Sequence, residues 1–186
     1  MVMRLFIASG LPPQAARPVK ELQAFGKPLL GAAANWVAPE TLHLTYVFLG
    51  AVTEDRVPEV TGAVERTAGL FKSLTVRLGG LGAFPSFEHP RVLWLGLDEA
   101  GHGPLKELAC RLSETLISEG FVFDFYFKPH ITIARIKMQP GPDLLADLRR
   151  KAAELSATYV IRSVEVLQSR ASATTGYKIL ASTRLQ

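Results

Sequence analysis

The stretch TLHLTYVFLG runs from Thr41 to Gly50. It is apolar nearly throughout, yet His43 and Thr45 stand in it two positions apart. In a β-strand the side chains of residues i and i+2 point to the same face, so the imidazole and the hydroxyl share one face and the neighbouring leucines share the other. The stretch therefore predicts a strand with an apolar face for the core and a polar pair on the opposite face.

The same pattern recurs in KPHITIARIK, residues 128–137, where His130 and Thr132 are again two positions apart. The chain has only four histidines, and the other two, His89 and His102, lie in turn-like sequence where we expect surface residues. A single histidine on an apolar strand is more often hydrogen-bonded in the interior than catalytic. Two histidines with the same His-x-Thr pattern favour a shared active site.

Further segments repeat at the spacing that separates the two motifs. His130 follows His43 by 87 positions, and the strand-like segment at 91–93 follows the one at 4–6 by the same 87. Such self-similarity indicates a fold built twice. We therefore predict an α+β bilobal fold, in which two antiparallel sheets flanked by helices are related by a pseudo-twofold axis around a central cleft. We expect one domain with repeats at 1–89 and 90–186, whose spatial boundary moves if strands are exchanged.

Hydrophobic periodicity and turn residues predict the individual elements. We expect strands over residues 4–10, 41–50, 74–81, 91–97, 121–127, 130–136, 158–170 and 177–185. We expect helices over residues 11–27, 54–68, 104–119 and 143–155, with Thr53 as the N-cap of the second. The segment ASATTG at 171–176 is expected to be a turn between the last two strands.

Composition narrows the class of protein. The chain has 186 residues, of which 48% are hydrophobic and 20% charged, as in an ordinary globular domain. The formal net charge of +4 suits a phosphate-bearing ligand. The single cysteine, Cys110, excludes an intrachain disulfide, and we interpret it as a small buried filler. No apolar run reaches the roughly 18 residues that a membrane span needs, so we expect no membrane partner. We read the N-terminal residues as a first strand and expect a cytoplasmic protein, and we expect a monomer.

Two imidazoles and two hydroxyls in one cleft suit in-line displacement at phosphorus. Histidine has an ordinary pKa of about 6.5, so one imidazole can act as a base while the other acts as an acid. Threonine hydroxyls can donate to the phosphoryl oxygens. We expect no cofactor and no metal, because neither motif has an aspartate, glutamate or cysteine at ligand-like spacing and threonine is a poor zinc ligand.

The sequence resembles the two-histidine phosphoesterase superfamily, whose signature is a pair of His-x-Thr/Ser motifs. More closely, it is similar to the bacterial and archaeal RNA 2′,3′-cyclic phosphodiesterases, historically called 2′-5′ RNA ligases. The stretches that carry the resemblance are in family order and cover nearly the whole chain: MRLFIASGLP, LHLTYVFLG, FPSFEHPRVLWLGL, FKPHITIARI and GYKIL. The resemblance implies a bilobal α+β fold and a metal-independent enzyme that opens a terminal 2′,3′-cyclic phosphate on RNA to a 2′-phosphate.

The resemblance also implies a role for each motif residue. His43 would be the proton donor to the leaving 3′ oxygen and His130 the proton acceptor that activates water, an assignment that the nearly symmetric sequence cannot make. Thr45 and Thr132 would bind the phosphoryl oxygens. Arg135 matches a family arginine that meets the phosphate, although strand parity places it on the face opposite His130. We therefore expect the strand to end or bulge before Arg135.

Two features of the motif stretches remain open. Relatives often have leucine where this chain has Tyr46, which we expect on the apolar face, where it changes packing and leaves catalysis intact. An aromatic ring often stacks on a terminal base. The candidates in this chain are Phe6, Phe48, Tyr126 and Phe127, each of which core packing also explains.

Three alternatives to an RNA cyclic phosphodiesterase have different chemistry. A nucleotide or RNA-end binding module with little turnover would use the same cleft, although both histidines and both threonines are intact. The sequence does not exclude a phosphoesterase of the same superfamily that acts on a small cyclic phosphate. An ATP-dependent RNA ligase is disfavoured, because the sequence has neither a lysine-nucleophile motif nor a phosphate-binding glycine loop.

Overall fold

The computed structural model describes residues 1–99, 103–155, 157–169 and 176–186. His102 therefore lies outside the described residues, and so does the expected turn at 171–176 except for Gly176. The α-helices are α1 (Pro13–Leu30), α2 (Val57–Ala68), α3 (Pro104–Ser118) and α4 (Pro142–Ala153), with 3-10 turns η1 (Gly31–Ala33), η2 (Pro39–Thr41) and η3 (Glu54–Arg56). The strands are β1 (Val2–Gly10), β2 (Ala34–Trp36), β3 (His43–Thr53), β4 (Leu74–Phe84), β5 (Val92–Glu99), β6 (His130–Ile136), β7 (Thr158–Ile161), β8 (Ser163–Ser169) and β9 (Tyr177–Arg184).

All described strands belong to one antiparallel sheet with the order β7-β4-β5-β6-β3-β1-β8-β9, to which β2 adds by pairing with β6. The two motif strands, β3 and β6, are central neighbours in this order. We call β1, β3, β8 and β9 the first half-sheet, and β2, β4, β5, β6 and β7 the second half-sheet. The predicted two sheets are thus two halves that meet at β3 and β6.

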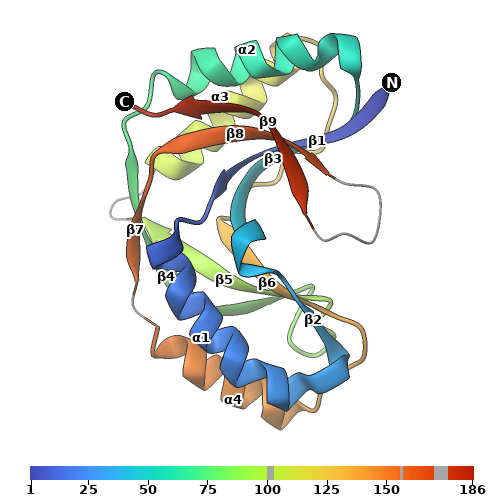
Figure 1. Ribbon diagram of the computed structural model, residues 1–186, viewed down its shortest axis with the longest axis vertical. Helices are drawn as coiled ribbons and strands as arrows, with labels where there is room; N and C mark the ends of the chain where they lie inside the picture. The colour runs from blue at the N-terminus through green and yellow to red at the C-terminus, as the bar shows by residue number, and fades with distance from the viewer. Residues whose placement is uncertain (100–102, 156, 170–175) are drawn as a thin grey trace.

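Helices cover the outer face of each half-sheet and give the molecule two lobes (Figure 1). Helices α2 and α3 pack together against the first half-sheet, and α1 and α4 pack together against the second. The α+β bilobal fold is confirmed. Each lobe combines early and late parts of the chain, since α3 and β8 lie with β1, and α1 and β4 lie with β6. That 1–89 and 90–186 are repeats of one unit stays a prediction.

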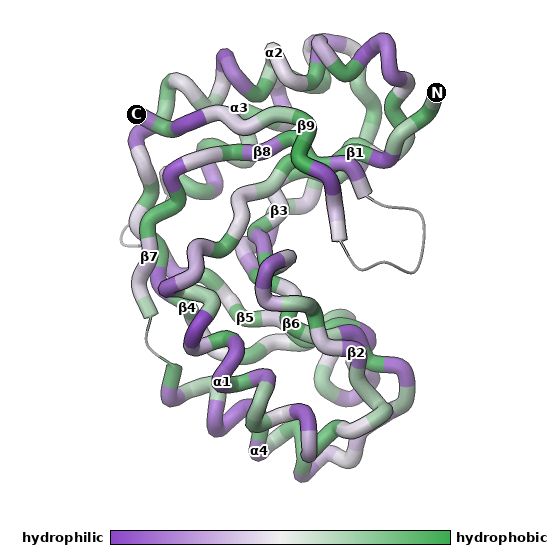
Figure 2. The backbone as a smooth tube through the Cα atoms, in the orientation of Figure 1, coloured by the Kyte–Doolittle hydropathy of each residue, from purple (hydrophilic) through white to green (hydrophobic). Residues whose placement is uncertain are grey.

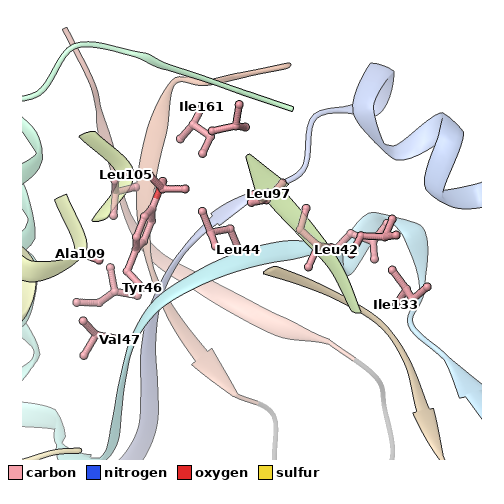
Figure 3. Close-up of a cluster of buried hydrophobic side chains, with 14 of the residues drawn as sticks. Leu42, Leu44, Tyr46, Val47, Leu97, Leu105, Ala109, Ile133 and Ile161 are labelled. Atoms are coloured by element: carbon pink, nitrogen blue, oxygen red, sulfur yellow. The ribbon is translucent and has the colours of Figure 1, made fainter. Parts of the chain in front are cut away.

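The core lies between the sheet and its helices and is continuous across both lobes. Strand residues that alternate toward the helices are apolar, and Figure 2 shows the corresponding alternation of hydropathy along the backbone. Figure 3 shows side chains of β3 packed among residues of β5, β6, β7 and α3. Among them are Leu44, 1% exposed, and Ile133, 0% exposed. Burial of each such side chain stabilises the fold by about 1.5–3 kcal/mol.

Two predicted strands are wrong. Residues 121–127 have no regular structure. The apolar alternation there instead anchors a connecting segment, in which Phe121 packs in the core and under the guanidinium of Arg56. The expected strand at 158–170 is broken at Arg162 into β7 and β8, which belong to opposite half-sheets.

Smaller features differ from the sequence-based expectations as well. The predicted helix at 54–68 begins as the 3-10 turn η3, and Thr53 makes no side-chain capping bond. Cys110 is partly exposed rather than buried. His89 is exposed, as predicted. Across the described parts of the chain, no helix is both long enough and apolar enough to span a membrane.

Candidate active site

One cavity of about 620 Å³ contains all five residues that the sequence nominated for the site. Both imidazoles, both threonines and Arg135 line it. The remaining lining residues come from β1, the β2–η2 segment, β3, β8 and the start of β9: Phe6, Asn35, Trp36, Val37, Ala38, Thr41, Phe48, Ser169, Gly176 and Tyr177. A cavity of about 640 Å³ beside α2 and α3 contains none of the nominated residues.

The register between the motif strands brings the two polar pairs together. Leu44 of β3 pairs with Ile131 of β6, and each lies at the centre of its His-x-Thr motif. In an antiparallel pair the flanking residues then face one another crosswise. His43 is therefore placed opposite Thr132, and Thr45 opposite His130, so each imidazole has a hydroxyl-bearing residue across the strand boundary.

Both imidazoles are oriented by the same hydrogen bond. The Nδ1 of His43 donates to the carbonyl oxygen of Thr41 at 2.7 Å, and the Nδ1 of His130 donates to that of Lys128 at 2.6 Å. A carbonyl can only accept, so Nδ1 carries the proton in both rings. Each neutral imidazole therefore keeps Nε2 as its basic nitrogen, and each protonated one keeps an Nε2–H that can be donated to a ligand in the cavity.

Both histidines are biased toward the neutral form. Burial is the main cause that lowers the pKa of His43, and the charges of His130 and Arg135 lower it further, against the opposing effect of the hydrogen bond to Thr41. Burial likewise lowers the pKa of His130, as does the charge of Lys128, against the hydrogen bond to the Lys128 carbonyl. An anionic phosphate between the two rings would favour protonation of either one.

A bulge in β6 brings Arg135 to the face of His130, as strand parity predicted. Leu93 pairs with Ala134 and the next residue, Trp94, pairs with Thr132, so the register skips Ile133. Ile133 and Ala134 are consecutive and both fully buried, which breaks the strand alternation. The residue after them therefore returns to the cavity face.

A matching bulge in β3 brings Phe48 to the same cavity. Ile7 pairs with Val47 and Ala8 pairs with Thr45, so the register skips Tyr46. Tyr46 and Val47 are both buried, at 3% and 2% exposure, and Phe48 after them is 65% exposed. Phe48 follows its histidine by the same number of positions as Arg135 follows His130. The two strands thus present an aromatic ring and a cation at equivalent places.

Tyr46 itself packs away from the cavity. Its hydroxyl lies 2.9 Å from the Oγ of Ser9, and its ring stacks on that of Phe127 with centroids 6.1 Å apart. The Ser9 hydroxyl donates to the carbonyl of Ser163. The substitution of tyrosine for the leucine of many relatives is therefore accommodated on the apolar face, as expected.

The four candidate base-stacking rings divide clearly. Phe48 is exposed and lines the cavity, whereas Phe6 lines it while only 6% exposed and in contact with His43, Phe48 and Tyr177. Phe127 packs against the core. Tyr126 is 82% exposed but does not line the cavity. Phe48 is the candidate with an available face at the site.

Sequence reasoning missed Tyr177, although GYKIL was among the stretches of resemblance. Its ring meets His43 edge-on, with centroids 5.4 Å apart, and meets Phe6 in the same way at 5.9 Å. Burial and the nearby Glu165 carboxylate raise the pKa of Tyr177, so its hydroxyl stays protonated. The signal that the sequence offered was only an aromatic residue at the start of a strand.

The wall formed by β2 and η2 was also missed. Its backbone is held by Gln23 of α1, which is 2% exposed and donates to the carbonyls of Val37 at 2.8 Å and Ile133 at 3.1 Å. Trp36 packs against Gly26 of α1, where a β-carbon would overlap the indole. A glutamine and a glycine within an otherwise helical apolar pattern are the signals that mark this contact.

The residues of the cavity are poor ligands for a metal ion. Among the described residues, no group of three or more histidine, cysteine, aspartate or glutamate side chains is arranged to hold one. The polar groups that converge are instead two imidazoles, two hydroxyls and a guanidinium. Such a set can bind an anion and transfer protons on both sides of it.

The comparisons with known proteins agree with this arrangement. Residues 10–94 match the sequence model of the LigT-like phosphoesterases. The RNA 2′,3′-cyclic phosphodiesterase of Archaeoglobus fulgidus is 32% identical over 90% of this chain and 91% of its own.

Solved structures share the fold along the whole chain. A protein of Thermus thermophilus superposes with a TM-score of 0.83 and 27% identity over 98% of both chains. E. coli LigT complexed with NADP+ superposes with a TM-score of 0.75 and 25% identity, over 100% of this chain and 99% of its own.

Proposed function

Because this chain belongs to the LigT-like phosphoesterase family and is a phosphodiesterase of the RNA 2′,3′-cyclic type, we propose that it hydrolyses a terminal 2′,3′-cyclic phosphate on RNA to a 2′-phosphate. The observation that carries this proposal is the single cavity that holds both histidines, both threonines and Arg135. The substrate class is inferred from the relatives, and the type of reaction is inferred from the residues that line the cavity.

The crosswise register suits in-line displacement. The attacking and leaving oxygens must lie on opposite sides of the phosphorus, so the base and the acid must also approach from opposite sides. His43 and His130 lie diagonally across the Leu44–Ile131 pair, one on each strand, which supports an approach from two sides. A cyclic phosphate bound between them has one Nε2 near each apical oxygen.

Two coupled proton transfers then complete the reaction. His130, neutral, takes a proton from water while the water oxygen forms its bond to phosphorus. The bond from phosphorus to the 3′ oxygen breaks, and His43, protonated, donates its Nε2 proton to that oxygen. The product carries a 2′-phosphate and a 3′-hydroxyl, and exchange of protons with solvent restores both rings. Each transfer contributes about 10²–10⁴-fold to the rate.

Thr45, Thr132 and Arg135 are proposed to hold the phosphoryl group. The hydroxyls donate to the non-bridging oxygens, where negative charge develops in the transition state. Arg135 supplies a permanent positive charge from the same cavity. Its charge lowers the pKa of His43 in the free protein, and the bound phosphate offsets that effect. Substrate binding therefore helps to load His43 with the proton that it donates.

Phe48 is proposed as the platform for the base of the terminal nucleotide. Its ring is 65% exposed, lines the cavity and sits beyond Thr45 on β3. Stacking on an aromatic ring is tolerant of base identity. Such a contact would let the enzyme bind RNA ends with any terminal base.

The test is turnover of a short RNA that ends in a 2′,3′-cyclic phosphate, with EDTA present throughout and the product followed by ³¹P NMR. We expect ring opening to the 2′-phosphate, unaffected by EDTA. A 3′-phosphate product contradicts the proposed leaving group, and loss of activity in EDTA contradicts a metal-independent reaction. A nucleoside 2′,3′-cyclic phosphate in parallel shows whether the enzyme needs the rest of the RNA.

A further inference from the structure

The residues that orient the two proposed catalytic histidines differ in charge. The carbonyl that orients each imidazole belongs to the residue two positions before it, which is Thr41 for His43 and Lys128 for His130. The Thr41 hydroxyl donates to the carbonyl of Ala38 at 2.8 Å, so this neutral side chain is bound within its own turn. Only at His130 does the orienting residue bring a cation.

The backbone of Lys128 is held in place by the residue that follows it. A residue before proline is restricted to extended conformations, and Pro129 itself has a fixed φ. The carbonyl of Pro129 also accepts a hydrogen bond from the Leu97 amide of β5 at 3.3 Å. These restraints fix the direction of the Lys128 carbonyl, and with it the ring of His130.

The side chain of Lys128 contacts two aromatic rings that also contact His130. Its Nζ lies 4.4 Å from the ring centroid of Trp94 and 5.4 Å from that of Phe84, within the range of about 6 Å for a cation–π contact. The same rings meet His130 edge-on, with centroid separations of 5.8 Å for Trp94 and 5.1 Å for Phe84. Ammonium and imidazole thus share two aromatic neighbours.

The two rings that contact the Lys128 ammonium belong to the second half-sheet. Trp94 pairs with Gly82 on one side and with Thr132 on the other, and its indole lies over Gly82, where a β-carbon would overlap it. His130 pairs with Gly96, whose missing side chain leaves space beside the same indole. The Lys128 ammonium therefore lies over Trp94, whose indole packs on Gly82 and whose strand, β5, pairs with β6.

The other charged or titratable groups around His130 act differently. His43 and Arg135 line the cavity, where a bound phosphate offsets positive charge. Asp98 on β5 forms an ion pair with Arg77 at 3.4 Å. Lys128 is exposed and does not line the cavity, so its charge remains when substrate is bound.

We propose that Lys128 is a positioning residue that assigns the roles of the two histidines. Its carbonyl orients His130 as that of Thr41 orients His43, but only Lys128 also holds an ammonium over the two aromatic rings beside its histidine, and this cation favours His130 as the ring that accepts a proton. This inference rests on the proposed function, which needs one acceptor and one donor. It gives a physical reason for an assignment that the symmetric His-x-Thr motifs leave open. The direction of the pKa shift agrees, since the Lys128 charge acts with burial to lower the pKa of His130.

The direct test is an NMR titration of the histidine Cε1 resonances in the protein without substrate. In Lys128→Met, which keeps the stem and removes the charge, the pKa of His130 rises, while that of His43 changes less and only downward, through the charge of His130. Lys128→Arg restores the original titration of His130. Lys137→Met is the matched control, because it removes an exposed lysine just beyond the same strand, and it leaves both histidines unchanged. An unshifted His130 in Lys128→Met, or equal shifts in both histidines, overturns the proposal.

The pH profile of kcat/KM supplies the second readout. The acceptor must be neutral, so its pKa sets the acidic limb of the profile. In Lys128→Met that limb moves to higher pH while the basic limb stays, and Lys128→Arg returns it. A basic limb that moves instead overturns the assignment of His130 as acceptor. If the unaltered protein opens no cyclic phosphate, the proposed function fails, yet the NMR titration still decides whether Lys128 governs His130.

Discussion

Leu44 and Ile131, which pair across the boundary between β3 and β6, are the two residues on which the whole site is built. They are 1% and 0% exposed, and each is flanked by the histidine and threonine of its own motif. Their apolar side chains join the core of the two lobes, while the residues on either side face the cavity. The register of one residue pair therefore determines which imidazole lies near which hydroxyl.

Removal of either motif hydroxyl is expected to impair the chemical step. Loss of one donor to the developing charge of an oxyanion typically costs about 10²-fold or more in kcat. We expect Thr45→Val and Thr132→Val each to show a loss of this order with little change in thermal stability. Thr75→Val is the matched control, since Thr75 is an exposed strand residue outside the cavity. Equal activity in all three variants would show that the motif hydroxyls do not contact the phosphate.

The pH optimum of kcat/KM is expected on the acidic side of the ordinary histidine pKa of about 6.5. The pKa values of both His43 and His130 are lowered, chiefly by burial. Activity requires one neutral and one protonated ring, so the bell-shaped profile is centred between the two lowered values. Above the two pKa values the proton donor is deprotonated, and below them the proton acceptor is protonated, so activity falls on both sides. A profile centred well above 6.5 would contradict the proton-transfer roles.

Phe48→Ala is expected to weaken binding of the nucleotide more than it slows the chemistry. Base stacking on an aromatic ring is worth about 1–3 kcal/mol, so KM should rise by roughly 5- to 150-fold while kcat changes little. Tyr126→Ala, at a residue 82% exposed and outside the cavity, is the control and should match the unaltered enzyme. If the two variants have the same KM, the base does not stack on Phe48.

Gly26→Ala should displace Trp36, and with it one wall of the cavity, although Gly26 does not line the cavity. In a helix this change usually stabilises by about 0.5–1 kcal/mol. Here the new β-carbon would overlap the Trp36 ring and reach 3.0 Å from Leu148, and such overpacking costs about 1–3 kcal/mol. We expect a lower melting temperature and a raised KM, because Trp36 lines the cavity.

The control for Gly26→Ala is Gly62→Ala in α2. Its nearest neighbour is the flexible end of Arg66 at 3.1 Å, so this variant should be as stable as the parent protein or more so, with unchanged activity. If both glycine variants behave alike in thermal unfolding and in KM, the contact between Gly26 and Trp36 does not shape the cavity wall.

Tyr46→Phe should separate stability from catalysis. It removes the hydrogen bond with Ser9, which is worth about 1 kcal/mol in the free energy of unfolding. Because Tyr46 lies on the apolar face of β3, kcat and KM should be unchanged. Chemical denaturation measures the first effect and steady-state kinetics the second, and a large loss of kcat would place Tyr46 in the site after all.

The motifs were predictable because strand parity is a local rule. His43 with Thr45 and His130 with Thr132 needed only the two-residue repeat of a strand, and the same rule required the bulge before Arg135 that the structure shows. The equivalent bulge at Tyr46 was missed, although it explains why Phe48 reaches the cavity. No polar residue after it signalled the break in alternation.

Non-local pairing was beyond the reach of the sequence. Nothing near Arg162 indicates that the chain leaves one half-sheet for the other there, since that depends on which strand edges are open in the folded protein. The segment at 121–127 has strand-like alternation but has no regular structure in the folded protein. The contact of Lys128 with Trp94 also joins residues on separate elements, so neither the short β2 wall nor this charge near His130 could be placed from spacing alone.

The proposed donor and acceptor can be separated by a single kinetic comparison with a cyclic substrate in which the bridging 3′ oxygen is replaced by sulfur. A thiolate leaves without needing a proton, so this substrate makes the general acid dispensable and leaves the base essential. With the oxygen substrate, we expect His43→Ala and His130→Ala each to lose about 10²–10⁴-fold in kcat/KM, while His89→Ala, at an exposed turn residue, loses nothing. With the sulfur substrate, His43→Ala should recover to near the activity of the unaltered enzyme and His130→Ala should not. Recovery of His130→Ala instead, or of neither variant, would contradict the proposed acid–base pair.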